Sequence, residues 1–198
     1  MSRLILASTS SARTTLLRAA GVAFEACGSG VDEEPLKRAW LAEGRGPAEI
    51  ADGLAEAKAL AVSRQEPDAL VIGADQTLDL GGALIDKPVN RADARVRLLS
   101  LRCREHRLHS AVVLARGETV VWRDRPSATL QVRDFSDAWL DAYLAGIDDA
   151  VLQSVGAYQL EGLGVQLFER IEGDWFTILG LPMLSLLAAL REQGLVAS

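Results

Sequence analysis

Five charged residues of this chain have side chains that could act together on a phosphate-containing substrate. They are the cations Arg13, Lys58 and Lys87 and the carboxylates Glu33 and Asp75. Cations stabilise the negative charge that develops on phosphoryl oxygens, while a carboxylate orients or deprotonates the attacking water, or holds a divalent metal. This combination of three cations and two acids indicates metal-assisted hydrolysis of a phosphoanhydride.

Four of these residues also have a purely structural interpretation. Asp75 could form a turn or cap a helix. Arg13 could lie on the surface of an ordinary capped helix, and Lys58 could extend from the flank of an apolar helix face. The acidic run at 32–34, which contains Glu33, is typical of a solvated turn. Residue types alone leave both interpretations open.

Several other kinds of chemistry lack their motifs in this sequence. It contains no P-loop, no glycine fingerprint for dinucleotides and no serine nucleophile elbow. The segment 73–77 lacks the leading Asp of an aspartyl-phosphate enzyme. Cys27 and Cys103 form no C-x-x-C motif, and His106 and His109 would point to opposite faces of a strand. Phosphoanhydride chemistry is therefore favoured over these alternatives.

The apolar run 69–75 is the element on which the predicted site depends. A short unbroken apolar run of this kind predicts a strand that is buried on both faces, at the centre of an α/β sheet. Open α/β sheets bind their ligands at the ends of such strands, so we expect Asp75 at the end of this one. A hairpin over 77–85, with a Gly-Gly turn, would bring Lys87 back toward Asp75.

A second strand-to-helix junction would supply a site for phosphate. The predicted strand 4–7 is followed by the hydroxyl residues 8–11, which can cap a helix over 12–20. The first N–H groups of a helix are free and carry partial positive charge. Ser8 and Arg13 would lie at this terminus, where a phosphate could bind without a glycine-rich loop.

The remaining chain alternates between predicted strands and predicted helices, which indicates an α/β fold. The hydrophobic periodicity and the capping residues predict strands over 22–27, 106–115, 118–132 and 165–171, a loop around the acidic run 32–34, and helices over 47–64, 91–101 and 136–144 with a last helix starting at 180–182.

Composition restricts the class of protein. The 198 residues suffice for one sizeable domain, and neither the 49% hydrophobic nor the 24% charged residues are unusual for a globular protein. No apolar run approaches the roughly 20 residues that span a membrane, and no signal peptide is evident, so we expect a cytoplasmic protein that does not bind membranes. The net charge of −6 argues against a nucleic-acid polymer as partner.

An ordered series of motifs resembles the Maf family of nucleoside triphosphate pyrophosphatases. The resemblance extends from about residue 4 to residue 190, which is nearly the whole chain. The matching segments, in chain order, are 4–13 with its Ser-Thr-Ser-Ser-Ala-Arg, the acidic pair Asp32-Glu33, 53–59 with Lys58, 72–76 (Ile-Gly-Ala-Asp-Gln), 86–88 (Asp-Lys-Pro), 156–162 (Gly-Ala-Tyr-Gln-Leu-Glu-Gly) and 180–182 (Gly-Leu-Pro).

The resemblance implies both a fold and a reaction. The fold is mixed α/β, with an elongated central sheet flanked by helices and a cleft between two lobes, as a single domain over 1–198. The reaction is the hydrolysis of a nucleoside triphosphate to a monophosphate and pyrophosphate with a divalent cation, Mg²⁺ or Mn²⁺, and members often form homodimers. The implied roles are general base and metal ligand for Asp75, metal or water binding for Glu33, and phosphate binding for Ser8, Arg13, Lys58 and Lys87.

Three positions distinguish branches of the family, and here they hold Ala12, Gln76 and Glu161. Gln76 with Glu161 is similar to the branch that hydrolyses 7-methyl-GTP, and a carboxylate suits the N–H donors of guanine. Ala12 departs from the large aromatic of that branch, and Thr14 stands where the family usually has a second Arg. A dTTP/UTP pyrophosphatase of the same family, or a nucleotide-binding regulator with little turnover, remain alternatives.

Overall fold

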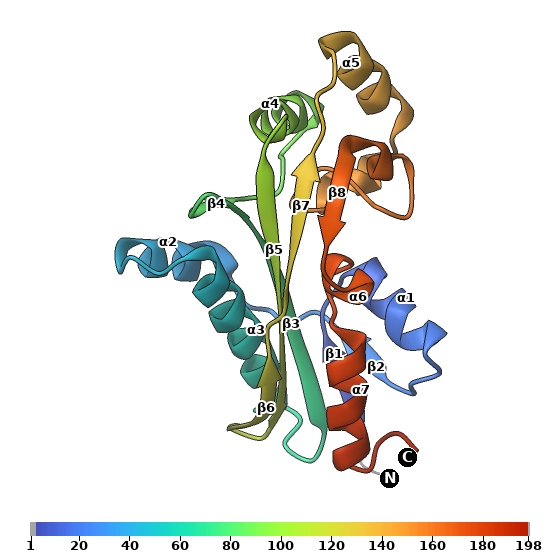
Figure 1. The fold of residues 1–198 in the computed structure, drawn as a ribbon. Helices are drawn as coiled ribbons and strands as arrows, with labels where there is room; N and C mark the ends of the chain where they lie inside the picture. The colour runs from blue at the N-terminus through green and yellow to red at the C-terminus, as the bar shows by residue number, and fades with distance from the viewer. Residues whose placement is uncertain (1–2, 198) are drawn as a thin grey trace.

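The computed structural model describes residues 3–197 and is built around one elongated, mixed β-sheet (Figure 1). Eight strands follow the order β2-β1-β3-β5-β7-β8, with β4 beside β3 and β6 beside β5. Strand β1 is parallel to β2 and β3, and the other pairs are antiparallel. The strands are β1 Leu4–Ala7, β2 Glu25–Cys27, β3 Leu70–Leu80, β4 Ala83–Ile85, β5 Glu105–Arg116, β6 Thr119–Asp124, β7 Ser127–Val132 and β8 Phe168–Glu172.

Helices cover both faces of the sheet (Figure 1). Helices α1 and α7 pack on one face and α3 packs on the other, whereas α4 and α5 lie at the end of the molecule far from both termini. The predicted mixed α/β fold is therefore confirmed. The helices are α1 Ser11–Ala19, α2 Glu33–Ala42, α3 Pro47–Ser63, α4 Arg91–Leu101, α5 Asp137–Gly146, α6 Trp175–Ile178 and α7 Met183–Glu192, with 3₁₀ turns η1 Asp149–Gln153 and η2 Leu163–Leu167.

The hydrophobic core is divided in a way that defines two lobes. One cluster joins α4, α5 and β7 to the second half of β3 and to the first part of β5. Three further clusters join α1, α3 and α7 to β1 and to the remaining parts of β3 and β5. Strands β3 and β5 thus run through both lobes, and they are the long elements that hold the lobes together.

The expectation that Asp75 ends its strand was wrong. Strand β3 continues to Leu80, and residues 71–79 pair with β5 without interruption. Along this strand Asp75, Thr77 and Asp79 lie on one face, and Gln76 and the buried Leu78 and Leu80 lie on the other. Asp75 therefore lies in the middle of β3 and not at its end. Its backbone pairs with β5, and its side chain contacts Lys58 of α3.

Two further boundaries differ from the prediction. The expected strand 118–132 is divided into β6 and β7 at Pro126, which has no N–H to donate to a ladder. The acidic run 32–34 is not a loop, because Glu33 and Glu34 form the first turn of α2, where acidic side chains suit the helix dipole. The predicted caps Asn90 and Ser136 are confirmed, since each side chain accepts a bond from a backbone N–H of its helix.

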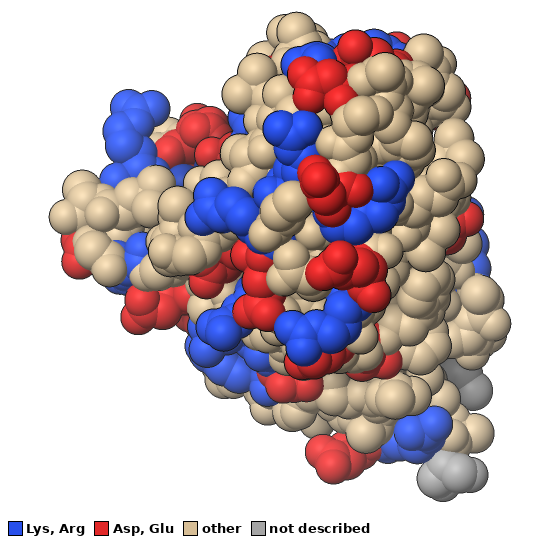
Figure 2. Space-filling model, turned by 45° about the horizontal axis from the view of Figure 1, so that its top comes forward, with Lys and Arg blue, Asp and Glu red and all other residues tan. Residues whose placement is uncertain are grey.

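Among residues 3–197, no helix is long and apolar enough to cross a membrane. Basic and acidic side chains are interspersed on the face shown in Figure 2. The cytoplasmic location, the homodimer, the absence of a nucleic-acid partner and the single domain over 1–198 stay predictions, and residues 1, 2 and 198 of that domain lie outside the described part.

The contact between α3 and β3 is unusually close, and glycine makes it possible. A Cβ atom built on Gly73 would lie 2.2 Å from the carbonyl oxygen of Ala55 and 2.7 Å from the Cβ of Ala59. Small residues on both elements thus let the helix backbone lie directly against the strand. Because Asp75 is on the same face of β3 as Gly73, the same contact sets how near Lys58 of α3 comes to Asp75.

We predict that Gly73→Ala destabilises the protein by about 1–3 kcal/mol, because the added methyl group forces α3 away from β3. The measurement is urea unfolding, with Gly146→Ala as the control. A Cβ on Gly146, at the end of α5, would have an ordinary contact of 3.5 Å with Leu163. Equal stability of the two variants would show that the close contact is not a constraint.

Candidate active site

A cavity of about 730 Å³ lies where the two lobes meet. It is lined by the loop after β1 and the start of α1 from one lobe, and by the segments around 84–87 and 150–161 from the other. All nine residues predicted from the sequence as site residues line this one cavity: Ser8, Ala12, Arg13, Glu33, Lys58, Asp75, Gln76, Lys87 and Glu161.

Lys58 links the two predicted carboxylates. Its Nζ lies 2.6 Å from an oxygen of Asp75 and 2.7 Å from an oxygen of Glu33. The Lys58 and Asp75 side chains are nearly buried, whereas that of Glu33 is 41% exposed at the cavity mouth. The structural alternative of a Lys58 that extends into solvent from the flank of α3 is therefore excluded. Three elements, α2, α3 and β3, meet at this single ammonium group.

Burial raises the pKa of Asp75 above its ordinary value of 3.8, although the charges of Lys58 and Arg13 oppose that change. Desolvation of the carboxylate is the larger effect because β3 lies at the centre of the sheet. A carboxylate with a raised pKa is a better proton acceptor than an exposed Asp. The position of Asp75 in the strand thus gives it the property that a general base needs.

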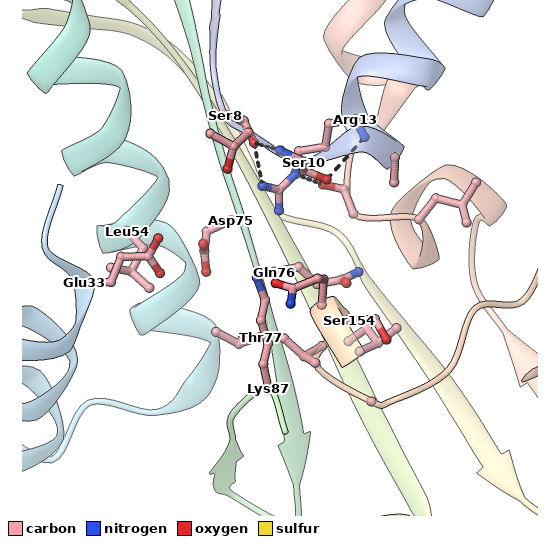
Figure 3. A pocket seen from close by; sticks show the side chains of 18 of the residues that line it. Ser8, Ser10, Arg13, Glu33, Leu54, Asp75, Gln76, Thr77, Lys87 and Ser154 are labelled. Atoms are coloured by element: carbon pink, nitrogen blue, oxygen red, sulfur yellow. Dashed lines mark hydrogen bonds between the residues drawn. The ribbon is translucent and has the colours of Figure 1, made fainter. Parts of the chain in front are cut away.

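The N-terminus of α1 forms one wall of the cavity (Figure 3). The Ser10 side chain caps α1, accepting from the Arg13 N–H, and Ser8 Oγ accepts from the Ser10 N–H at 3.2 Å. The Arg13 guanidinium donates through Nε to the Gly180 carbonyl at 2.8 Å and through Nη1 to Ser8 Oγ at 3.3 Å. Burial lowers the pKa of Arg13, which remains a cation at neutral pH.

Lys87 approaches from the opposite side, after β4 (Figure 3). Desolvation lowers the pKa of Lys87, and the nearby Arg13 charge adds to this effect. Its neighbour Asp86 is held by Lys37 of α2 at 2.8 Å. Arg13, Lys58 and Lys87 therefore surround Asp75 with positive charge, an arrangement that suits a polyphosphate.

The donor set fits a magnesium-type ion better than a metal with a complete protein cage. Residues 3–197 contain no group of three or more His, Cys, Asp or Glu side chains placed to hold a metal. Glu33 and Asp75 offer hard oxygen ligands that face each other in Figure 3. Mg²⁺ is commonly bound by one or two carboxylates, with water and substrate phosphates completing its shell. Two carboxylates in the cavity that the start of α1 also lines match that pattern.

The three predicted specificity residues differ in how freely they can reach a ligand. Ala12 lies in the first turn of α1 and adds no aromatic surface to the cavity. Gln76 Nε2 donates to the carbonyls of Thr177 and Ile178, both at 3.0 Å, so its amide oxygen is the group left for a ligand. Glu161 is exposed on the segment between Tyr158 and η2, and no ion pair to it occurs within residues 3–197.

Sequence reasoning missed several residues that support the site. Lys37 lines the cavity, and Ser110 and Thr177 are buried behind Gln76. Lys37 follows Glu34 at a helical spacing of three, so recognition of α2 would have indicated this ion pair. Ser110 and Thr177 carry no signal in the sequence because their contacts depend on the packing of α6 against β5.

The sequence matches the family described as Maf-like protein over residues 3–193. The chain belongs to the Maf family. A nucleoside triphosphate pyrophosphatase of Caulobacter vibrioides is 59% identical to this Maf chain over 189 residues, covering 96% of it and 94% of the relative. A 7-methyl-GTP pyrophosphatase of Rhizobium meliloti is 53% identical over 193 residues, covering 98% and 97%. The solved HAM1 protein of Coxiella burnetii matches with a TM-score of 0.44 and 13% identity, over 67% of this chain and 73% of that one.

The raised pKa of Asp75 predicts a pH-dependent cost to the stability of this Maf protein. The folded state holds the proton more tightly than the unfolded state, so the wild type loses stability as the pH rises from about 4 through the pKa of folded Asp75. Asp75→Asn does not titrate. Its stability relative to wild type should therefore increase over this pH range, by about 1.4 kcal/mol for each unit by which the pKa is raised.

Urea unfolding of both proteins between pH 4.5 and pH 8 measures this difference. If the unfolding free energy of Asp75→Asn minus that of the wild type stays constant, or decreases with rising pH, the result would contradict a raised pKa at Asp75.

Proposed function

We propose that this protein hydrolyses the α–β phosphoanhydride bond of a nucleoside triphosphate and releases pyrophosphate. The observation that carries the proposal is the buried Asp75–Lys58 pair in one cavity with Arg13, Lys87 and the start of α1. The Caulobacter vibrioides and Rhizobium meliloti relatives, both named as pyrophosphatases, support the same reaction.

The triphosphate is held by the wall that α1 forms. Free N–H groups at the start of a helix bind phosphate oxygens, and the Ser8 hydroxyl lies beside them. Arg13 keeps guanidinium hydrogens available beyond its bonds to Gly180 and Ser8, and charge-assisted bonds of this kind orient phosphates. Lys87 provides a positive charge on the side of the cavity opposite α1. A triphosphate held in this way would have its α-phosphorus near Asp75.

The hydrolytic step needs a water molecule, a base and a stabilised leaving group. Asp75 accepts a proton from the water while the water oxygen forms a bond to the α-phosphorus. At the same time the bond between the α-phosphorus and the oxygen that bridges to the β-phosphate breaks. The bond electrons leave with pyrophosphate, whose charge is stabilised by Arg13 and Lys87. Lys58 keeps Asp75 ionised before the step, because its ammonium group opposes the desolvation of the carboxylate.

We propose that a divalent cation, Mg²⁺ or Mn²⁺, takes part. Glu33 and the Asp75 oxygen would hold it together with phosphate oxygens, as the donor set of the cavity allows. When bound, such an ion neutralises charge on the phosphates. Glu33 itself is kept at the cavity by its contact with Lys58.

The base side of the cavity favours a guanine-type nucleotide, such as 7-methyl-GTP. The Glu161 carboxylate and the Gln76 amide oxygen are acceptors, and a guanine edge offers the N1–H and N2–H₂ donors they need. Thymine and uracil offer one N–H between two carbonyls, which a carboxylate repels. Ala12 adds no aromatic ring above the base, so discrimination between GTP and its methylated form should be weak.

A nucleotide panel with Mg²⁺ or Mn²⁺ tests the reaction and the base choice together. We expect pyrophosphate as the first product, with GTP and 7-methyl-GTP preferred to dTTP and UTP by about ten- to a hundredfold in kcat/KM, the cost of a mispaired acceptor that the bound base removes from water. Glu161→Gln should narrow this preference and keep much of kcat, because its amide both donates and accepts.

Three outcomes would contradict the proposal. Orthophosphate as the first product would exclude cleavage at the α–β bond. Tight nucleotide binding without hydrolysis at high protein concentration would favour a binding protein over an enzyme. A kcat/KM for dTTP or UTP that equals that for the guanine nucleotides would exclude the proposed roles of Gln76 and Glu161.

A further inference from the structure

A buried serine behind the cavity is bonded to the segment that holds Arg13. Ser110, on β5, is fully buried. Its hydroxyl donates to the Thr177 carbonyl at 2.6 Å, and its oxygen lies 2.9 Å from Gln76 Nε2, whose two hydrogens are shared among this oxygen and the carbonyls of Thr177 and Ile178. The Ser110 side chain of β5 therefore contacts α6 through its hydroxyl hydrogen and β3 through its oxygen, and so connects three elements.

Helix α6 depends on these side chains because it is short. It has four residues, and its last carbonyls have few partners within the helix. Gln76 donates to the carbonyls of Thr177 and Ile178, and Ser110 donates to Thr177 as well. At the other end, Asp174 accepts from the Thr177 N–H at 2.8 Å. Side chains from the sheet thus fix the C-terminal end of α6.

The next turn transmits this position to the cavity. The Gly180 N–H donates to the Thr177 carbonyl at 3.1 Å, and Gly180 has a φ of +89°, which favours glycine. The Gly180 carbonyl then accepts from Arg13 Nε at 2.8 Å. An unbroken series of contacts leads from Ser110 through Thr177 and Gly180 to Arg13.

We propose that Ser110 is a positioning residue that sets the guanidinium of Arg13 for phosphate binding, an inference that rests on the proposed function. Arginine has a long side chain, and holding its guanidinium in one orientation before the substrate arrives removes an ordering cost from binding. Loss of the Ser110 hydroxyl removes a donor from the Thr177 carbonyl and loosens the turn at Gly180. The phosphate contact of Arg13 then weakens.

The expected kinetic effect is on binding more than on the chemical step. Arg13 binds the phosphates before cleavage and stabilises the pyrophosphate as it leaves, so its loss of order raises KM and lowers kcat to a smaller extent. A net hydrogen bond contributes about 0.5–1.5 kcal/mol, so Ser110→Ala should raise KM about two- to tenfold. Ser110→Thr, which retains a hydroxyl, should restore much of the wild-type KM.

The chain provides a matched control in Ser63. This serine is also fully buried, and its hydroxyl donates to the Gly117 carbonyl at 2.5 Å at the end of α3. It does not line the cavity. Ser63→Ala therefore loses an equivalent bond elsewhere, and it should reduce stability to a similar extent while KM and kcat stay at wild-type values.

A double-mutant cycle with Arg13→Lys makes the test specific, because Lys lacks the Nε donor that Gly180 binds. If Ser110 acts through Arg13, adding Ser110→Ala to Arg13→Lys should change KM less than twofold. The two changes would multiply if they acted independently, and this result would overturn the proposal. A wild-type KM in Ser110→Ala, or an equal KM rise in Ser63→Ala, would overturn it too.

A second readout separates this inference from the proposed function. If the wild type releases no pyrophosphate, the proposed function fails, and the same cycle is then measured as the Kd for GTP by calorimetry. Hydrogen exchange adds a structural measure, since Ser110→Ala should accelerate exchange at the Gly180 and Leu181 amides, which donate to Thr177 and Phe176. Unchanged exchange at both amides would contradict the link.

Discussion

The rest of the structure depends on the placement of a carboxylate in the middle of a buried strand. Asp75 is desolvated by the sheet around it, and an unpaired buried charge of this kind is strongly unfavourable. The Lys58 ammonium at 2.6 Å compensates for that loss of water. The pair is a weak source of stability, because the desolvation of two charges offsets most of their attraction. What the pair provides is a carboxylate with a raised pKa in a fixed position.

This pairing explains the close packing around it. Lys58 can reach Asp75 because Gly73 and the small residues Ala55 and Ala59 let α3 lie directly on β3. The alternation of side chains along β3 then sends Gln76 to the opposite face, where it binds the end of α6. One strand thus carries the proposed base on one face and a proposed specificity residue on the other.

Much of the site could be predicted from the sequence because its motifs are local. Ser8 and Arg13 flank a capped helix start, and the cap could be recognised from residue types. The gathering of nine distant residues into one cavity followed from the family resemblance, since no local pattern indicates which strand ends meet. The continuation of β3 past Asp75 was missed because a charged residue normally ends a buried strand. Asp75 can be accommodated inside the strand because the Lys58 ammonium group compensates its charge.

Other features could not be predicted because they depend on packing between distant segments. Pro126 in the sequence could have indicated the interruption between β6 and β7. That both strands pair with β5 is shown only by the three-dimensional arrangement. Helix α2 has no fully buried residue, and its packing on α3 through Trp40 beside Gly53, like the ion pair of Lys37 with Asp86, appears only once these elements are placed together. The bonds of Ser110 likewise become visible only once α6 is packed against the sheet.

The most direct test of the role of Lys58 is the pKa of Asp75 itself. The carboxyl carbon of Asp75 can be titrated by ¹³C NMR in the wild type and in Lys58→Met, where the charge is removed and the chain length is largely kept. We expect a pKa above the ordinary Asp value in the wild type and a further rise in Lys58→Met, because desolvation then acts without its opposing charge. A pKa that is the same in both proteins, or lower in the variant, would contradict the account.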